Sequence, residues 1–452
     1  MAASWSQQFA ARWHLDVPPD LTDWLDQQRW QLAGGGEFHR PLAPLDVLRP
    51  PPGIFWSGLL LPDTLPVIGN DYGDWLCLRV SERGTIAEWI AWSHAGGDWI
   101  GVGQSFAEAL WHDAARYRQQ PLQAGHAAWA PRDTDTGPVD AHVAWARDWL
   151  TRQRRWPPNS TLDSADPQDR DRLHPGQLAD GQLPAVVARD QLLDCLDNPL
   201  RRQADFRSAL RLGVDWETDF ARWLFDSDLI PPSWQSRLQA GFTNADRPWS
   251  QNWEAAEQVA RRVLGERRDL SWPFVVVGWS CERRGDRAQA CRFYYEGLRA
   301  SAFTDETARL HTSWASGGGG KFVAARLRHL RDCWDDAMAR DEYLRLMTST
   351  ATDSATDSDS QADPAADRFV ERVSDYWLRQ ARACEAAREG AADGTAAGGR
   401  AYDAYYRAGW DLGVARRENY RPILEGLVRS AHRAGHAARA AIAEWHLNNL
   451  RE

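Results

Sequence analysis

Lysine, paired cysteines and long apolar runs are scarce in this chain of 452 residues. Lys321 is the only lysine among 53 basic residues, so arginine carries almost all of the positive charge. No apolar run approaches the ~20 residues that a membrane helix needs. The opening residues MAASWSQQFAARW also lack the apolar segment of a secretory signal. These absences argue against a membrane protein and a secreted one, and a cytoplasmic location is expected.

The cysteines are scattered and form no C-x-x-C pair. This pattern favours free thiols in a reducing compartment over a disulfide framework or a zinc site. The six are Cys77, Cys195, Cys281, Cys291, Cys333 and Cys384. The net charge of −10 argues against general nucleic-acid binding, which needs a basic face, and it suits a partner with a basic surface. No cofactor is expected.

Tryptophan, by contrast, is abundant, with 26 residues spread from Trp5 to Trp445. Because they occur in every segment, we expect most of them to fill cores between helices. A minority would be exposed as anchors of an interface.

The first 120 residues predict an α+β domain in which helices flank an antiparallel sheet. Residues 1–30 read as helix, break and helix, and residues 31–55 are a Gly- and Pro-rich loop. The apolar-rich run 75–80, the alternating residues 85–92 and the strand-like residues 98–104 are separated by turn sequences, and together they indicate a meander of strands.

A helix is predicted directly after the meander. Ser105 followed by Glu108 has the spacing of a capping box, and Phe106, Ala109 and Leu110 form an apolar stripe behind it.

Beyond this domain the sequence predicts mostly helices. Residues 121–185 are polar and Pro-rich, with one helix near 141–155, and only helical periodicity follows from about residue 186. The Ser/Thr/Asp-rich segment 349–367 is expected to be disordered, and residues 389–399 to form a flexible loop. The predicted domains are an α+β domain (1–125), a connector (126–185), a helical region (186–348), a disordered linker (349–368) and a C-terminal helical region (369–452).

The segment 59–111 resembles the SUKH superfamily of Smi/Knr type. The family pattern consists, in chain order, of Pro-apolar-Gly-Asn-Asp, Gly-Asp and Cys-Leu. A hairpin follows, and Ser-Phe then begins a helix. The matching residues are Pro66, Ile68, Gly69, Asn70, Asp71, Gly73, Asp74, Cys77, Leu78, Ser105, Phe106 and Leu110. We expect these residues to be mainly structural, with Gly69 to Asp74 turning the chain into a buried strand.

The resemblance implies a helix-flanked antiparallel sheet and a non-enzymatic, protein-binding function. Bacterial members of the superfamily look like immunity proteins that bind a toxin domain, and fungal members resemble cell-wall regulators. Arg79 stands where an aspartate is common, and we expect this departure to concern the rim of the domain.

Residues 272–298 resemble one tetratricopeptide repeat. Gly278, Gly285, Ala290, Tyr294 and Gly297 fall near the positions expected for the repeat. Residues 420–447 follow the same helix-Gly-helix plan with poorer agreement, and a stable array needs about three repeats. The sequence therefore predicts a TPR-like helical region without deciding whether it is a true array.

Other chemistry fits the sequence less well. Asn70, Asp71 and Asp74 lack calcium-loop spacing, and SGGGGK (316–321) lacks the Ser or Thr of a P-loop. His432 and His436 are four residues apart, but a Gly between them indicates a helix break and no HExxH glutamate is present.

Three functional hypotheses remain open. The first is an immunity-type or regulatory protein that binds its partner through the SUKH-like domain. The second is a scaffold whose helical half binds the partner. The third is an undetected enzyme, for which His94 and Asp98 in one turn are the nearest to a catalytic pair.

Overall fold

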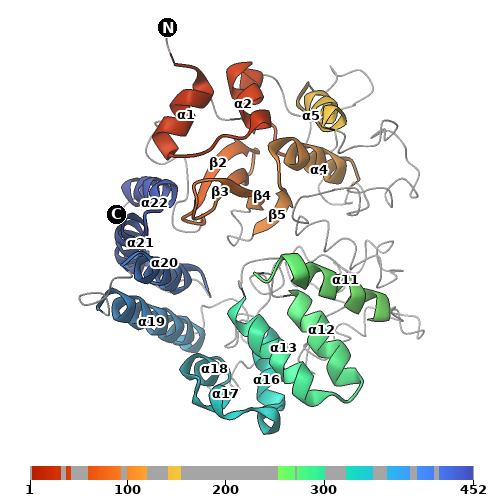
Figure 1. Cartoon of the computed structure of the whole chain (residues 1–452), viewed down its shortest axis with the longest axis vertical. Helices are drawn as coiled ribbons and strands as arrows, with labels where there is room; N and C mark the ends of the chain where they lie inside the picture. Colours follow the sequence, from red (N-terminus) through yellow and green to blue (C-terminus); the bar gives the residue numbers. More distant parts are fainter. Residues whose placement is uncertain are drawn as a thin grey trace. The chain divides into compact units, whose positions relative to one another are not determined.

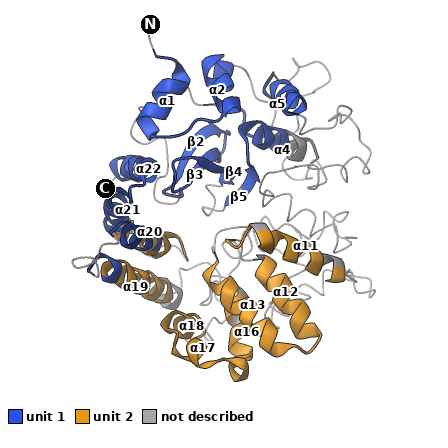
Figure 2. Cartoon of the chain, in the orientation of Figure 1, with its two compact units in different colours: residues 1–187, 383–403, 421–452 blue, residues 188–382, 404–420 orange. Residues whose placement is uncertain are grey.

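The computed structural model divides the chain into two compact units, coloured separately in Figure 2. Unit 1 comprises Met1–Val187, Ala383–Asp403 and Arg421–Glu452, and unit 2 comprises Ala188–Arg382 and Ala404–Tyr420. The structure describes residues 3–31, 37–41, 60–92, 99–119, 141–153, 253–269, 272–300, 322–349, 364–386, 394–411 and 417–450.

A five-stranded antiparallel sheet forms the centre of unit 1, and its strands follow one another in chain order (Figure 1). The strands are β1 (Arg40–Pro41), β2 (Thr64–Gly69), β3 (Trp75–Val80), β4 (Ile86–Trp92) and β5 (Trp99–Gly103). The predicted meander is therefore confirmed. Strand β2 was not predicted, because all six of its residues are buried and its sequence shows no alternation.

Helices from the N-terminal part of the chain flank this sheet, one of them directly against β4 and β5. They are α1 (Trp5–Trp13), α2 (Pro19–Asp26), the 3₁₀ turn η1 (Arg29–Gln31), α4 (Phe106–Gln119) and α5 (Ala141–Arg152). The Phe106 ring lies 4.5 Å from Trp89 of the sheet and 5.0 Å from Trp24 of α2, measured between ring centres. The predicted α+β fold and its helices are confirmed here.

The start of α4 has the predicted capping box and a second cap that comes from far away in the sequence. Ser105 Oγ accepts from the Glu108 amide at 3.2 Å, and Glu108 Oε2 accepts from the Ser105 amide at 3.1 Å. Asp20 Oδ2, which lies on α2, accepts from the amides of Phe106 at 2.7 Å and Ala107 at 3.1 Å. Burial raises the pKa of Asp20, although these backbone hydrogen bonds act to lower it.

Two C-terminal helices, α21 (Tyr420–Ala434) and α22 (Ala437–Asn449), complete the core of unit 1. The Trp445 ring packs edge-on against Trp13 of α1, with 6.1 Å between ring centres. The fully buried His446 donates from Nε2 to the Thr64 carbonyl at 3.0 Å. The sequence assigned residues 369–452 to a separate C-terminal region. These contacts show that the last helix of that region packs with the N-terminal domain instead.

Helix α20 (Gly394–Trp410) corrects one prediction, because it includes six residues of the expected loop 389–399. A Cβ built at Gly398 would lie 2.8 Å from the Ala434 backbone nitrogen. The Gly- and Ala-rich composition that looked flexible in the sequence thus allows α20 and α21 to approach closely.

Unit 2 is built from packed helices. They are α11 (Trp253–Glu266), α12 (Trp272–Arg283), α13 (Arg287–Arg299), α16 (Phe322–His329), η5 (Arg331–Cys333), α17 (Asp336–Arg340), α18 (Glu342–Met347), the N-terminal part of α19 (Pro364–Ala386), the last turns of α20 and η6 (Arg417–Asn419). The predicted helical region is confirmed over these residues.

A buried polar network lies within unit 2. The Tyr343 hydroxyl donates to Asp411 Oδ2 at 2.5 Å, and Trp377 Nε1 donates to the same oxygen at 2.9 Å. Ser374 Oγ donates to the Ala408 carbonyl at 2.8 Å. Burial is the main reason that the pKa of Tyr343 is raised well above its usual range.

Helix α19 begins at Pro364, so the last five residues of the predicted linker 349–368 are helical. Proline is favoured in the first turn of a helix, which explains this start. The rest of that linker from residue 350 lies outside the described residues, as do most of the predicted connector and residues 188–252.

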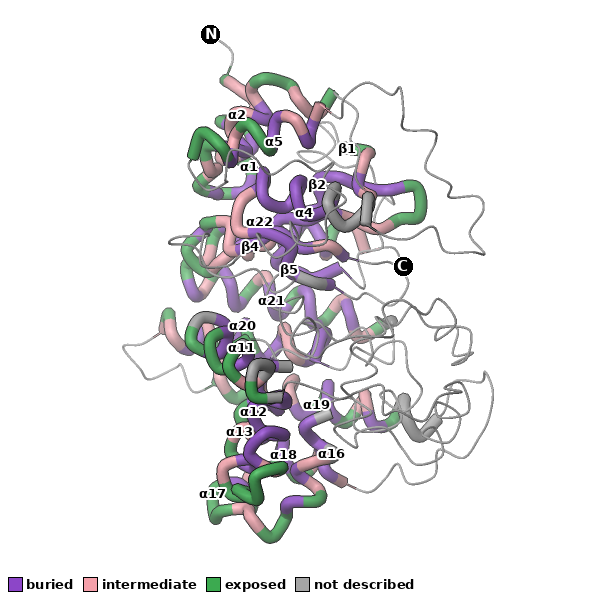
Figure 3. The backbone as a smooth tube through the Cα atoms, turned by 90° about the vertical axis from the view of Figure 1, so that its right-hand side faces the viewer, coloured by how far each residue is buried: buried purple, intermediate pink, exposed green. Residues whose placement is uncertain are grey.

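The tryptophans whose side chains the structure describes are buried or half-buried, as predicted for core residues. Figure 3 shows buried residues along β2, β4 and α22. Among the described residues, Tyr72 is the exposed large hydrophobic side chain, at 42% exposure.

Candidate functional site

The polar residues of the SUKH-like motif form a hydrogen-bonded turn between β2 and β3. Asn70 Oδ1 accepts from the amides of Tyr72 and Asp74, each at 2.9 Å. Asn70 Nδ2 donates to Asp74 Oδ2 at 3.0 Å. Gly73 has φ of 94°, a conformation that an L side chain rarely adopts. The dense polar residues are therefore used by the turn itself, as the sequence predicted.

The apolar residues of the motif lie in the core of unit 1. Pro66 pairs with Cys77, and Leu78 pairs with Trp89 across the sheet. Gly69 lies against Trp75, because a Cβ there would lie 2.7 Å from the indole ring. Burial raises the pKa of the Cys77 thiol well above its usual value, which disfavours the reactive thiolate.

Arg79, the departure from the SUKH pattern, lies inside the sheet rather than on its rim. Its Nε is 3.1 Å from Asp63 Oδ2, and its Nη1 is 3.1 Å from Glu88 Oε1. The Asp63 and Glu88 side chains are only 1% and 5% exposed, so an aspartate in place of Arg79 would add a third negative charge to a buried site. The pairing of β3 with β4 places Arg79 opposite Glu88, a register that the sequence alone did not reveal.

The exposed part of the motif is the tip of the β2–β3 turn. Asp71 and Tyr72 lie there with side chains that are 44% and 42% exposed. Asp71 forms an ion pair with Arg40 of β1, and His39 Nε2 lies 3.4 Å from Asp71 Oδ2. We call Asp71, Tyr72, Arg40 and His39 the turn surface.

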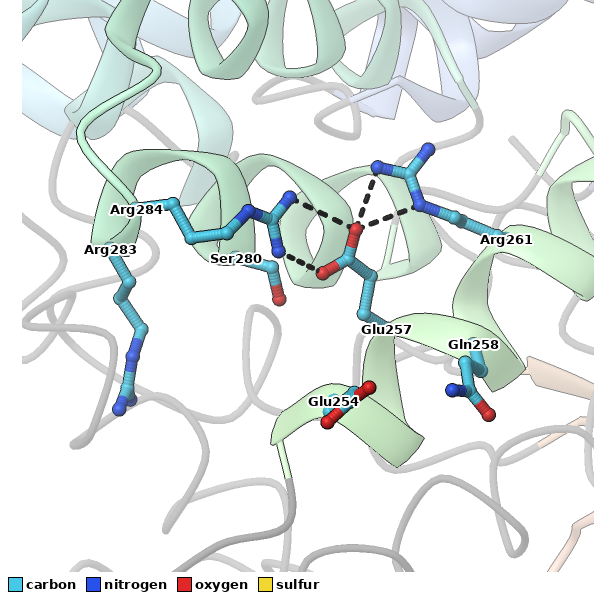
Figure 4. A pocket seen from close by; sticks show the side chains of 7 residues that line it. All are labelled: Glu254, Glu257, Gln258, Arg261, Ser280, Arg283 and Arg284. Atoms are coloured by element: carbon cyan, nitrogen blue, oxygen red, sulfur yellow. Dashed lines mark hydrogen bonds and ion pairs between the residues drawn. The ribbon is translucent and has the colours of Figure 1, made fainter.

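A second candidate site is a cavity of about 480 Å³ between α11 and α12 in unit 2, lined by polar and charged residues (Figure 4). Its lining residues are Glu254, Glu257, Gln258, Arg261, Ser280, Arg283 and Arg284. Burial alone would raise the pKa of Glu257, but hydrogen bonds from Arg284 and Arg261 lower it below its ordinary value. Sequence reasoning missed this cavity, because its residues are spread over two helices with no motif spacing.

The remaining candidates from the sequence do not come together in the described structure. His94, Asp98, Cys195 and SGGGGK (316–321) lie outside the described residues. His436 lies at the start of α22, and its pKa is lowered by burial and by the charge of Arg439. In the part of the chain that the structure describes, we find no group of three or more His, Cys, Asp or Glu that could hold a metal ion. Every helix in that part is too short or too polar to span a bilayer.

We compared the chain with protein-family models, curated proteins and solved structures. No protein-family model, curated protein or solved structure matches this chain.

Proposed function

We propose that this protein is a non-catalytic binding protein of immunity or regulatory type, which recognises a protein partner through the SUKH-like part of unit 1. The observation that carries the proposal is that most residues of the motif are structural, whereas the tip of its turn is exposed. Asn70 and Asp74 form the hydrogen bonds of the turn and the apolar residues of the motif fill the core, while the tip of the turn exposes Asp71 and Tyr72. Such an arrangement suits recognition by a surface.

The chemistry of the turn surface supports this function. Tyrosine is enriched among the residues that contribute most to protein interfaces, since it combines a large apolar ring with a hydroxyl. Asp71 beside it is paired with Arg40, so the negative charge that a partner meets is that of the whole chain, which has a net charge of −10. A basic partner, such as a nuclease-type toxin domain, would be attracted by this charge.

The test is protection of cells by the full chain against a toxin domain whose gene neighbours its own, combined with binding measured between the two purified proteins. Tyr72→Ala should weaken binding about tenfold or more, as expected for an interface anchor. Arg83→Ala, in the exposed turn between β3 and β4, is the matched control and should leave binding unchanged. Equal binding by the two variants would rule out the turn surface.

A second candidate function is a helical scaffold, favoured by the α12–α13 hairpin. A Cβ at Gly278 would lie 2.4 Å from the Tyr294 ring, so two residues of the TPR resemblance lie against each other between the helices. Arg292→Glu, on the exposed face of α13, would then abolish partner binding while Tyr72→Ala would not. The same pair of variants thus separates the two functions.

A further inference from the structure

The cavity between α11 and α12 contains two arginines whose guanidinium groups are held by one carboxylate (Figure 4). Arg261 donates to Glu257 Oε1 from Nε at 2.8 Å, and its Nη2 lies 2.7 Å from the same oxygen. Arg284 donates to Oε1 from Nη2 at 3.1 Å and to Oε2 from Nη1. Each guanidinium has five N–H groups, so these contacts leave further donors of both arginines for a ligand.

Ser280 is the second, independent observation. The residue is 4% exposed, and its hydroxyl is buried without a hydrogen-bond partner. It lines the cavity together with Arg284 (Figure 4). A buried hydroxyl without a partner is unusual in a folded protein and calls for a physical explanation. An oxygen atom of a ligand would supply the missing acceptor.

The charge of the lining indicates the sign of that ligand. Arg261, Arg283 and Arg284 outnumber Glu254 and Glu257, which leaves one net positive charge around the cavity. A guanidinium fork matches the geometry of phosphate and carboxylate oxygens. The volume of about 480 Å³ lies within the range of small-molecule sites and exceeds what a single small anion fills.

From these observations we propose that the α11–α12 cavity binds a small molecule through an oxyanion group, a phosphate or a carboxylate, which accepts from Arg261, Arg284 and Ser280. Glu257 does not touch the ligand in this arrangement. It holds the two guanidinium groups in place and prevents their mutual repulsion. The site lies wholly within unit 2 and is independent of the proposed protein-binding function of unit 1.

The proposal is tested by titrating the full chain with inorganic phosphate and, separately, with acetate, at constant ionic strength set by chloride. Isothermal calorimetry should show saturable binding of one of them, and the preferred anion identifies the oxyanion class. Ser280→Ala should weaken that binding about tenfold or more, the effect of one hydrogen bond to a charged group. Arg284→Lys should weaken it about tenfold, because lysine lacks the planar fork. Arg292→Gln, an exposed arginine of α13, is the control and should bind as the wild type does.

A thermal-stability measurement on the ligand-free protein separates binding from folding. Ser280→Ala removes an unsatisfied buried hydroxyl, so its melting temperature should equal or exceed that of the wild type while its anion affinity falls. Absence of saturable binding of either anion to the wild type would overturn the proposal. Unchanged affinity in Ser280→Ala, or an equal loss in Arg292→Gln, would also overturn it.

Discussion

The helical hairpins α12–α13 and α21–α22 have the same type of turn between their helices, but the contacts between the two helices differ. In both, the turn glycine has positive φ, 82° at Gly285 and 74° at Gly435. The next amide donates back across the turn in the same way, from Asp286 to Cys281 and from His436 to Ala431, each at 2.9 Å. A single glycine at the turn is thus enough to set the backbone path in both hairpins.

The contact between the helices is where the two hairpins diverge. In the first, the Tyr294 ring packs directly on Gly278, and Phe274 packs on Gly297. In the second, Val428 and Glu444 occupy the positions that correspond to Gly278 and Tyr294. The comparison shows that a helix-Gly-helix pattern identifies a turn, whereas the small and aromatic residues determine how closely the two helices pack.

The second hairpin uses its last helix for a different purpose. Trp445 and His446 of α22 pack on α1 and β2 of unit 1. At the position that corresponds to His446, the first hairpin has Glu296, whose side chain is 46% exposed. The two hairpins should therefore differ in how pH, side-chain packing and helix capping affect their stability.

The largest effect is expected from His446. Burial lowers the pKa of His446 to about 4 from its usual 6.5, although the Thr64 hydrogen bond and the Asp63 charge act in the opposite direction. Between these two pH values the unfolded chain binds a proton that the folded chain excludes, so the stability of unit 1 should fall as pH falls. The loss should total about 3 kcal/mol, at 1.36 kcal/mol per pKa unit.

Urea unfolding at a series of pH values, followed by hydrogen–deuterium exchange in unit 1, measures this loss. His446→Gln should flatten the dependence between pH 6.5 and 4, since glutamine does not titrate. Glu296→Gln in the first hairpin is the matched control and should change little, because exposed charges contribute weakly. If the stability of His446→Gln depends on pH as that of the wild type does, His446 is not the cause of the pH dependence.

The next largest effect is expected from filling the close contact of the first hairpin. In Gly278→Val the new side chain would collide with Tyr294, which is fully buried, and overpacking of this kind costs about 1–3 kcal/mol. Val428→Ile at the corresponding position should cost less than about 0.5 kcal/mol, because Val428 is only half-buried. Exchange protection of α12 and α21 reports each hairpin separately, and similar losses at both sites would mean that the hairpins pack alike.

Substitution of the turn glycine should reduce stability by the same amount in both hairpins, and by less than Gly278→Val does. Gly285→Ala and Gly435→Ala should each cost about 1–2 kcal/mol, the penalty of the left-handed conformation for a residue with a Cβ. No atom lies within 4 Å of a Cβ built at either glycine, so steric contacts should add nothing. Clearly unequal costs in denaturant titrations of the two variants would show that the turns are not equivalent.

The smallest difference concerns the caps after these glycines. Asp286 accepts from the Gln289 amide at 3.1 Å, whereas the His436 side chain makes no cap hydrogen bond. Asp286→Ala should therefore cost about 1 kcal/mol and His436→Ala close to nothing. Melting temperatures of the two single variants provide the measurement, and a larger loss in His436→Ala would refute the comparison.

The sequence predicted those features of the fold that depend on neighbours in the chain. The strands β3 to β5, the Ser105 cap and the Gly435 break follow from local periodicity and turn residues. Strand β2 was missed because a fully buried strand has no alternation. The loop expected at residues 389–399 was partly wrong because its small residues serve helix packing.

The features that escaped prediction depend on residues far apart in the sequence. Asp20 caps α4 across 86 positions, and Glu257 meets Arg284 across 27. Arg79 was placed on the rim because nothing in its own strand indicates the buried Asp63 and Glu88. The motif residues that form the turn were found because their hydrogen bonds are local.

The contact between His446 and Thr64 has a consequence for biosynthesis. The two residues are 382 positions apart, so a ribosome that adds about 5–20 residues per second completes β2 roughly 20–80 s before α22 is made. Throughout that interval the Trp13 surface of the nascent chain lacks the helix that covers it in the finished protein. The N-terminal sheet can therefore reach its final packing only after α22 has been made, so its folding waits for a segment that is synthesised hundreds of residues later.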